Sequence, residues 1–416
     1  MMNKEFVENH SLWKPPDKSL KFKHKTNSWF NVNYMNKTIR RGNEKVVQTT
    51  NIRARTVHIF PTLIQRNILL NWFEICRQVY NLTVSYLKTN KMYNYFTLRK
   101  VMDKQINTKI NLVKSIEKYK VPKHMRDNAI HDCLKAYDSS FGLIKSKHIT
   151  HFKIRYKKKS HHLSTAVIEP GMISKIKNAF CPTALGEMTS EEPLNCITMD
   201  SRLCYNSRTH IFCIKVPYTK VVDTELRRNF KVSLDPGVRT FQTCYTPAGN
   251  CYDICSLKSG KQIKSIIKRI ENVKKHSPKH KKFLARLREK LSNKIADLHW
   301  KTANYLCKKF SKIIIGNLST KGIISKSNNL PKIVKKQCVA LSHCLFKQRL
   351  QSKADEYDCK VVVMDESYTS KTCGSCGDIN HSLGSSKSFK CSCGFKCDRD
   401  INGARNIMLK YLYSKQ

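Results

Sequence analysis

The sequence predicts an α/β protein that carries a small cysteine-rich metal module. Three short segments with apolar residues are typical of buried strands, "KVSLD", "SKIIIG" and "CKVVVMDE", and the last two are rich in β-branched residues. Longer segments with apolar residues at helical spacing lie before and between them. The last five of the 18 cysteines cluster near the C-terminal end of the sequence.

The chain is strongly basic. Its 416 residues include 78 Lys and Arg against 30 Asp and Glu, a formal net charge of +48. A charge of this size opposes compaction unless an anionic partner neutralises it, and nucleic acid is the expected partner. An anionic membrane is the rival, but the sequence has no clean basic amphipathic helix, long apolar run or signal-peptide core, so no membrane partner is expected.

Most of the other cysteines are scattered singly through apolar segments, as at Cys76, Cys133, Cys307 and Cys344. This pattern is typical of reduced thiols, and it predicts an intracellular protein. The expected compartment is the nucleus for a eukaryotic or viral host and the cytoplasm for a prokaryote.

Three regions are expected along the chain. Residues 1–55 are polar and basic with little periodicity, and they are predicted to form a flexible arm. Residues 56–225 follow, opening with a strand, a turn at Pro61 and a helix, and residues 226–416 form the third region. The first helix is predicted from the helical spacing of Leu69, Trp72, Phe73, Cys76, Val79 and Tyr80.

Further helices and strands follow from the same patterns. The segment "RDNAIHDCLKAYDSSFGLIKS" predicts a second helix, while "HITHFKIRYKKKSHH" and "RTHIFCIKVPYTK" predict strands. A basic helical stretch over residues 257–310 is interrupted by "KKHSPKHKK", which predicts a helical hairpin. One more helix is expected over about residues 335–357.

Two close cysteine pairs predict a zinc ribbon. Two residues separate Cys373 from Cys376, and one residue separates Cys391 from Cys393. Each pair is followed by a glycine, and a polar loop separates the two pairs. Four thiolates on two tight knuckles occupy the corners of a tetrahedron around one structural Zn²⁺ ion. The second pair is one residue shorter than usual, so Cys397 is an alternative ligand in place of Cys391 or Cys393.

Acids are scarce in this chain, so those at the ends of predicted elements stand out. Asp235 ends the strand in "VSLDPG", Asp365 and Glu366 end the strand in "VVVMDES", and Asp398 and Asp400 begin a helix in "CDRDINGARNI". Carboxylates from separate strands and a helix start can converge on a pair of divalent ions, and Mg²⁺ prefers such oxygen ligands. A two-magnesium site for phosphodiester hydrolysis is therefore predicted.

Each acid also has a purely structural interpretation. Asp235 precedes Pro-Gly and suits a turn, and Asp398 suits a helix N-cap. Taken together, these acids favour a catalytic site, since the predicted zinc ribbon lies in the sequence between Glu366 and Asp398. Adjacent strand residues point to opposite faces, so only one of Asp365 and Glu366 is expected to face the metals.

The motifs "LDPGVRTF", "DESYTSKTCGSCG" and "CDRDINGARNI" resemble, in this order, those of TnpB, the transposon-encoded RNA-guided nuclease, and of its eukaryotic and giant-virus relatives, the Fanzor proteins. The resemblance covers roughly residues 55–412. It implies an RNase H-like RuvC nuclease fold, a mixed sheet with flanking helices, with the zinc ribbon inserted at about 370–396. It also implies a preceding wedge-like β-barrel with an inserted helical recognition segment, here about 62–148.

The function implied by the resemblance is that of a Mg²⁺-dependent DNA endonuclease that cuts double-stranded DNA matched by a bound guide RNA. Asp235 matches the first catalytic aspartate and Asp400 the last, with Asp398 in support. TnpB proteins carry a glutamate where this chain has Gly316, in "SKIIIGNL". Fanzor proteins commonly carry instead a glutamate just before "YTSKTC", where Glu366 stands, so this chain is expected to lie closer to the Fanzor branch.

Two other functions remain open at this point. One is a non-cleaving DNA-binding transposition factor that uses the ribbon and the basic surface, and the other is a DNA-joining transposase. The position of Glu366 discriminates between binding and catalysis. A side chain that reaches Asp235 and Asp400 at one sheet edge favours catalysis, whereas one that points into the core or to solvent favours binding alone.

Overall fold

The structure is a computed structural model, and it describes residues 40–41, 44–45, 50–91, 93–221, 230–255, 257–273, 278–325, 330–384 and 386–414. Residues Ile52–Thr219 form one compact unit and Lys220–Gln416 belong to a second. None of the helices in the described ranges is both long enough and apolar enough to cross a membrane.

The predicted basic arm lies largely outside the described residues. Within it, β1 (Arg40–Arg41) and β2 (Glu44–Lys45) pair antiparallel. Strand β3 already begins at Thr50, so the predicted end of the arm at residue 55 is wrong. Residues that the sequence assigns to the arm are held by partners far along the chain, since this strand pairs in a sheet with Ile211–Val221 and Arg55 on it lies 3.3 Å from Glu192.

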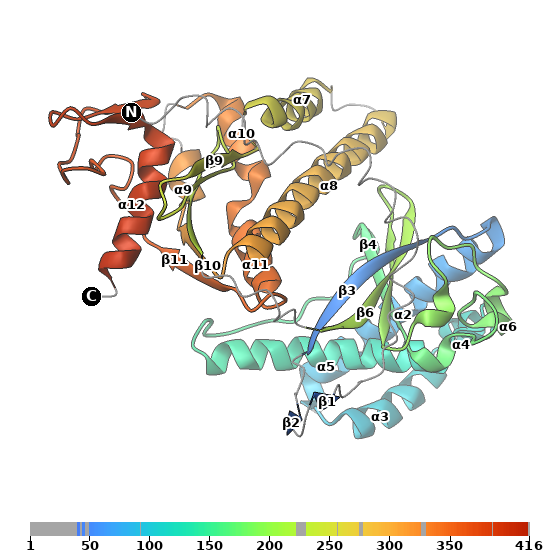
Figure 1. The fold of residues 1–416 in the computed structure, drawn as a ribbon. Helices are drawn as coiled ribbons and strands as arrows, with labels where there is room; N and C mark the ends of the chain where they lie inside the picture. Colours follow the sequence, from blue (N-terminus) through green and yellow to red (C-terminus); the bar gives the residue numbers. More distant parts are fainter. Residues whose placement is uncertain are drawn as a thin grey trace. The chain divides into compact units, whose positions relative to one another are not determined.

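The first unit combines helices with a four-stranded sheet of order β3-β6-β5-β4 (Figure 1). Pairings among its described residues do not join β3 to β4, so the wedge-like barrel stays a prediction. The elements are β3 (Thr50–Ile59), α2 (Leu63–Asn90), α3 (Tyr95–Asn107), α4 (Ile110–Lys118), α5 (Lys123–Lys145), β4 (Leu163–Ile168), η2 (Pro170–Met172), α6 (Pro182–Leu185), η3 (Leu194–Cys196), β5 (Ser201–Asn206) and β6 (Ile211–Val221).

Helix α2 begins where the sequence predicts it, just after Pro61. Thr62 and Gln65 form a reciprocal capping box that satisfies the first free backbone N–H groups of the helix. The side chains predicted to form its apolar face are all buried, namely Leu69, Trp72, Phe73, Cys76, Val79 and Tyr80.

The second unit is built on a five-stranded mixed sheet of order β11-β10-β7-β8-β9. Strands β10 and β11 run parallel to β7, and β8 is antiparallel to both β7 and β9. The elements are β7 (Lys231–Pro236), β8 (Gln242–Tyr245), β9 (Cys251–Ile254), α7 (Leu257–Asn272), α8 (Pro278–Lys309), β10 (Lys312–Gly316), α9 (Thr320–Ile324), α10 (Lys332–Leu341), α11 (His343–Ala354), β11 (Lys360–Met364), β12 (Ser388–Lys390), β13 (Lys396–Asp398) and α12 (Arg399–Tyr413).

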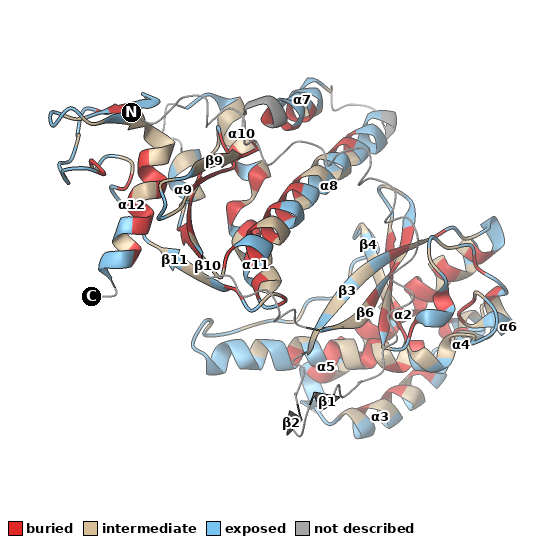
Figure 2. Ribbon diagram, in the orientation of Figure 1, coloured by how far each residue is buried: buried red, intermediate tan, exposed pale blue. Residues whose placement is uncertain are grey.

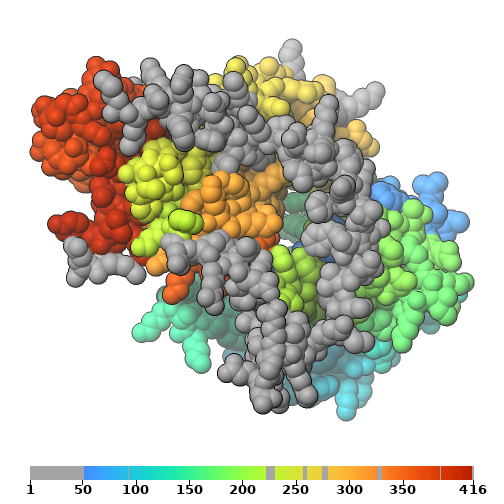
Figure 3. Space-filling view, viewed as in Figure 1, coloured from blue at the N-terminus to red at the C-terminus, as the bar shows by residue number. Residues whose placement is uncertain are grey.

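Helices cover both faces of this sheet, and strand alternation decides which residues meet which helix. Leu234 and Ile315 pack into a core with residues of α8 and α11. Ile314, one residue away, packs on the other face against Ile407 of α12. The central strands and the inner side of α8 are correspondingly buried (Figure 2). Figure 3 shows the C-terminal segment, in red, beside the yellow-green segment of β8 and β9.

The helical hairpin predicted around "KKHSPKHKK" is present as α7 and α8, which pack against each other. The single helix predicted over about 335–357 is wrong, because two helices, α10 and α11, meet at Ser342. Ser342 has a φ of +47°, a left-handed conformation that ends α10.

Two buried histidines on these helices predict an acid-sensitive fold. His299 and His343 both stack on Phe241, with ring centroids 5.3 and 5.2 Å away, and burial lowers the pKa of each histidine to about 4. An unfolded histidine takes up a proton near pH 6.5, so the stability should be complete above pH 6.5 and fall progressively down to about pH 4. Urea unfolding across this range checks the slope.

The loss should amount to as much as about 3 kcal/mol per histidine. His343→Gln serves as the comparison, because a residue without a titrating ring removes its share of the pH dependence. A pH slope that is unchanged in this variant would show that the buried ring does not cause it.

Candidate functional site

Three neighbouring parallel strands end at one edge of the second sheet. Leu234 on β7 pairs with Ile315 on β10, so Asp235 and Gly316 occupy the next position on each strand. Gly316 in turn pairs with Met364 at the end of β11, and Glu366 follows two residues later. The strand alternation directs Asp235 and Gly316 to the face that α12 covers.

Glu366 occupies the space that a side chain at position 316 would need. A Cβ atom placed on Gly316 would lie 2.7 Å from Glu366 Oε2, and 3.1 Å from both Ile407 Cδ1 and Pro236 Cδ. Glu366 is only partly exposed, and its Oε2 atom is buried without a hydrogen-bond partner among the described residues. The carboxylate therefore reaches from the end of β11 across to β10.

Helix α12 approaches Asp235 very closely. The Ser233 hydroxyl donates a 2.6 Å hydrogen bond to the Ala404 carbonyl, which fixes the helix on β7. A Cβ atom on Gly403 would lie 2.6 Å from Asp235 Oδ2. Glycine at position 403 thus provides the room in which the Asp235 carboxylate lies beside the helix.

The third predicted acid stands in the first turn of α12. Asp398 is the N-cap, and its Oδ1 atom accepts a 2.8 Å hydrogen bond from the backbone N–H of Asp400. Its other oxygen lies 3.3 Å from Lys387 Nζ. These contacts support the predicted roles of the two residues: Asp398 caps the start of the helix, and Asp400 is the candidate metal ligand.

The pKa values of all three acids are raised. Burial, and then the charges of Asp400 and Glu366, raise the pKa of Asp235 well above its usual range. Burial and the neighbouring Asp365 raise the pKa of Glu366 to about 7, and burial and Asp398 raise the pKa of Asp400. Buried or partly buried carboxyl groups whose charge is disfavoured by burial and by neighbouring acids are donors that a divalent cation stabilises.

Asp365 does not belong to this set. It is exposed, it accepts a 2.9 Å hydrogen bond from the Ser367 hydroxyl, and it lies 3.4 Å from Lys410 Nζ. Hydrogen bonds from Ser367 lower its pKa. The structure thus separates the two neighbours, with Glu366 toward Gly316 and Asp365 toward solvent, although both residues follow the last residue of β11.

A fourth acid, which the sequence does not predict as a site residue, lies near the edge. Asp253 on β9 lies across from Thr243 on β8, which in turn pairs with Asp235, and Thr243 donates a 2.9 Å hydrogen bond to Asp253. Burial, together with the charges of Asp398 and Asp400, raises the pKa of Asp253. The available signal was an acid inside the apolar stretch "CYDIC".

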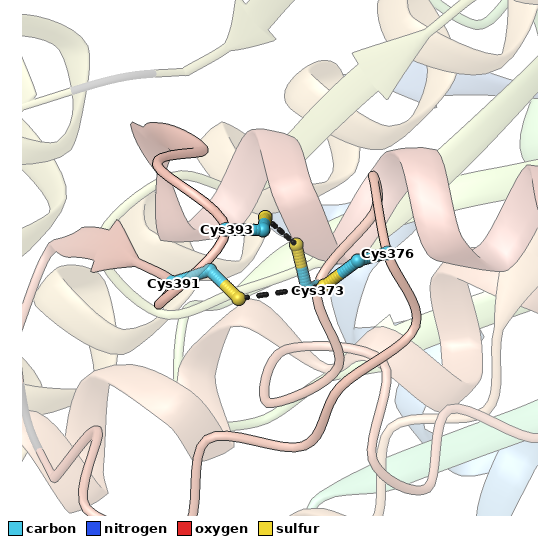
Figure 4. Close-up of side chains that lie close together, drawn as sticks. All are labelled: Cys373, Cys376, Cys391 and Cys393. Carbon is cyan, nitrogen blue, oxygen red and sulfur yellow. Dashed lines mark hydrogen bonds between the residues drawn. The ribbon is translucent and has the colours of Figure 1, made fainter.

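Four cysteine sulfurs form a second cluster (Figure 4). The Sγ atoms of Cys373, Cys376, Cys391 and Cys393 all lie within 4.8 Å of one another, with separations of 3.7 Å for Cys373–Cys393 and 3.5 Å for Cys376–Cys391. Tetrahedral Zn²⁺ with bonds of about 2.3 Å requires sulfurs about 3.8 Å apart, so this donor set fits the ion. Among the described residues no comparably tight group includes the carboxylates or Cys397.

Both cysteine pairs lie on similar turns. Gly377 follows the first pair with a φ of +87°, and Gly394 follows the second with a φ of +84°. Their N–H groups donate to the carbonyls of Cys373 and Cys391, at 3.0 and 3.1 Å. The left-handed conformation favours glycine at both positions, which explains the Cys-Gly pattern in the sequence.

Two buried asparagines tie the cysteine module to α12. Asn402 donates a 2.7 Å hydrogen bond to the Thr372 carbonyl and accepts one of 3.1 Å from the Gly374 N–H. Asn406 donates to the carbonyls of Thr369 and Thr372, at 2.8 and 2.7 Å. The chain between Glu366 and the first knuckle is therefore fixed on the helix that carries Asp400.

Three family models match the chain. They are described as a helix-turn-helix domain, over residues 51–90, as a probable transposase, over residues 211–326, and as a Cas12f1-like TNB domain, over residues 343–407.

Relatives from viruses and bacteria also match. A TnpB-like protein, L79 of Acanthamoeba polyphaga mimivirus, is 31% identical over 383 residues, which are 86% of this chain and 73% of the relative. A putative RNA-guided DNA endonuclease of Streptomyces pristinaespiralis is 26% identical over 31% of this chain and 32% of its own. The CRISPR-associated endodeoxyribonuclease Cas12f1 of Sulfoacidibacillus thermotolerans is 39% identical over 67 residues, 15% of this chain and 16% of its own. The extent of the first match shows that this chain belongs to the TnpB family.

Proposed function

We propose that the protein is an RNA-guided DNA endonuclease that hydrolyses phosphodiester bonds of guide-matched double-stranded DNA. One observation carries the proposal: the Glu366 carboxylate lies in the space left by Gly316, at the sheet edge where Asp235 ends the neighbouring strand. A carboxylate with a buried oxygen that no described group satisfies is costly unless it binds a cation or a proton.

Asp235, Glu366 and Asp400 are the proposed ligands of two Mg²⁺ ions. When bound, such ions activate water and stabilise the leaving oxygen of a phosphodiester. The residues of the chain provide the placement, since Gly316 and Gly403 leave room for the Glu366 and Asp235 carboxylates. The sheet is mixed: among its five described strands, only β8 runs antiparallel to the others. This arrangement supports assignment to the RNase H-like RuvC class.

The net charge of +48 supports a nucleic-acid partner, because lysine and arginine side chains neutralise phosphates. The relatives described as endonucleases support a nuclease, and one of them is named as RNA-guided. The guide RNA and the DNA target are therefore part of the proposal. The Gly316 and Glu366 pattern supports placement near the Fanzor branch.

The proposal is tested by purifying the full chain with its co-purifying RNA, sequencing that RNA and measuring Mg²⁺-dependent cleavage of a matching duplex. We expect a discrete RNA and cleavage that Asp235→Ala abolishes. Absence of a discrete RNA would contradict guidance. A complex that binds matched DNA without cutting it would favour a transposition factor, and joined rather than hydrolysed products would favour a transposase.

Gly316→Ala should lower the cleavage rate by about 100-fold without unfolding the protein, an effect like the loss of one precisely placed catalytic group. The new methyl group would lie 2.7 Å from Glu366 Oε2, the far end of a flexible side chain that is able to move away. The displaced carboxylate would then leave the metal site. Single-turnover cleavage and thermal unfolding of the variant check the two halves of this prediction.

Gly322→Ala is the matched control. Gly322 lies in the short helix α9 of the same unit, and a Cβ atom there would meet no heavy atom within 4 Å. Its cleavage rate should equal that of the unmodified protein. Equal rates for both alanine variants would show that Glu366 does not act from the space beside Gly316.

A further inference from the structure

A solvent-open cleft lies directly beside Glu366. It has a volume of about 290 Å³ and is lined by Glu366, Tyr368, Ser370, Lys371 and Arg399. Ser370 Oγ would lie 3.5 Å from a Cβ atom on Gly403, the same point that is 2.6 Å from Asp235 Oδ2. The cleft therefore opens onto the carboxylates from the turn that joins β11 to the cysteine module.

Tyr368 stands at the rim of this cleft in an unusual conformation. Its φ is +65°, a left-handed backbone that bulky side chains rarely adopt. Its side chain is nevertheless not used for packing, because the residue is 60% exposed and no ring or cation contact involves it within the described part of the chain. Strain that does not improve packing is typical of positions that serve a ligand.

The surrounding turn holds Tyr368 in place from several sides. Its carbonyl accepts hydrogen bonds from the N–H groups of Lys371 and Thr372, both at 2.9 Å, and from the Thr372 hydroxyl at 3.0 Å. Thr369 donates to the Glu366 carbonyl from both its N–H, at 3.1 Å, and its hydroxyl, at 2.8 Å. The backbone that carries the exposed ring is thus tied by hydrogen bonds to the turn that begins at Glu366.

Cations complete the cleft. Lys371 is exposed and lines the cleft with Tyr368, and Arg399 also lines it, with one of its nitrogens donating a 2.8 Å hydrogen bond to the Gly384 carbonyl. An exposed aromatic ring flanked by cations is the arrangement that binds single-stranded nucleic acid, with a base stacked on the ring and the backbone phosphates near the cations. A base inside a duplex has both faces covered by its stacked neighbours, so it offers no free face to such a ring.

We propose that this cleft holds one unpaired nucleotide of the DNA strand to be cut, with its base on Tyr368 and its phosphates near Lys371 and Arg399. This inference rests on the proposed function, and it makes Tyr368 a positioning residue. A base held there places the adjoining phosphate over Glu366 and Asp235. Cutting would accordingly require that the strand be separated from its complement at this point.

The test uses the full chain with its bound RNA and a matched target that carries 2-aminopurine at successive positions around the cut. Stacking quenches 2-aminopurine fluorescence, so one position should be quenched in the unmodified protein and in Tyr368→Phe. Tyr368→Gly, which accepts the left-handed backbone, should lose the quenching at that position and raise the KM for cleavage about 10-fold, with a smaller change in kcat. Tyr368→Asn also tolerates this backbone and provides a second variant.

Tyr413→Ala is the control, because Tyr413 is an exposed tyrosine at the far end of α12. It should behave as the unmodified protein. A quenching pattern in Tyr368→Gly and Tyr368→Asn identical to that of the unmodified protein would overturn the inference and leave the nuclease proposal intact. Quenching at Tyr368 in a complex that never cuts would instead support the base site and overturn the proposed function.

Discussion

Replacing Glu366 with glutamine should lower the rate of target cleavage by about 1,000-fold. Glutamine keeps the shape of the side chain but carries no charge, so it removes one of the groups proposed to hold the cations. Metal-ion stabilisation of a phosphodiester transition state is worth several kcal/mol, and each 1.4 kcal/mol changes the rate about tenfold. Single-turnover cleavage at saturating Mg²⁺ measures the loss.

The fold and the bound RNA should be unaffected in this variant. Burial raises the pKa of Glu366 to about 7, so the charged form is disfavoured in the absence of cations, and a neutral amide should not lower the unfolding temperature. Asp365→Asn is the matched control, since that neighbour is exposed and paired with Lys410. If the Asp365 variant lost more activity than the Glu366 variant, the assignment of the middle acid would be reversed.

Loss of Cys391, a proposed zinc ligand, should have the second largest effect. Cys391→Ser should reduce the bound zinc from one ion per chain to none, because three thiolates and a hydroxyl hold the ion poorly. A small ribbon depends on its metal for folding, so the region around Leu383 and Phe389, which packs with Cys373, should become accessible to protease. Metal analysis and limited proteolysis measure these two changes.

Cleavage should also fall, by about 10-fold or more, because the first knuckle and the turn after Glu366 share the hydrogen bonds of Asn402 and Asn406. Cys397→Ser is the control. Cys397 lies on β13 outside the cluster of four sulfurs, so its variant should retain one zinc ion and full activity. If Cys397→Ser lost its zinc and Cys391→Ser kept it, Cys397 and not Cys391 would be the zinc ligand.

Local chemistry explains why much of this site was predictable from sequence. The Cys-Gly knuckles and the capping Asp398 are recognised from residues close together in the chain. Only one of Asp365 and Glu366 was expected to face the metals, and the structure places Glu366 beside Gly316 and Asp365 in solvent, although both follow the last residue of β11. Buried strands such as the one that contains Ile313 to Ile315 were predictable because a short run of apolar, β-branched residues is itself a local signal.

The remaining features depend on contacts between residues distant in sequence. Nothing near Asp253 in the chain indicates that β9 places it two strands from Asp235. The break at Ser342 depends on one left-handed residue inside an apolar pattern that reads as a continuous helix. Arg55 looks like part of a basic arm until Glu192, far along the chain, pairs with it.

Gly316 shows the same distinction most clearly. In the sequence it is a turn after a buried strand, and the resemblance to TnpB marks it as the site of a missing acid. The structure adds the steric fact that the Cβ position of residue 316 lies 2.7 Å from Glu366 Oε2. A larger residue at 316 and a glutamate at 366 would compete for one space.

The most direct test is to move the carboxylate from position 366 to position 316. Mg²⁺-dependent cleavage of a guide-matched duplex is measured for the unmodified complex, for Glu366→Gly, and for the double variant Gly316→Glu with Glu366→Gly. The account predicts that the single variant is inactive and that the double variant recovers at least about 10-fold, because a carboxylate again reaches the edge beside Asp235. Cleavage by Glu366→Gly at the rate of the unmodified protein would contradict it.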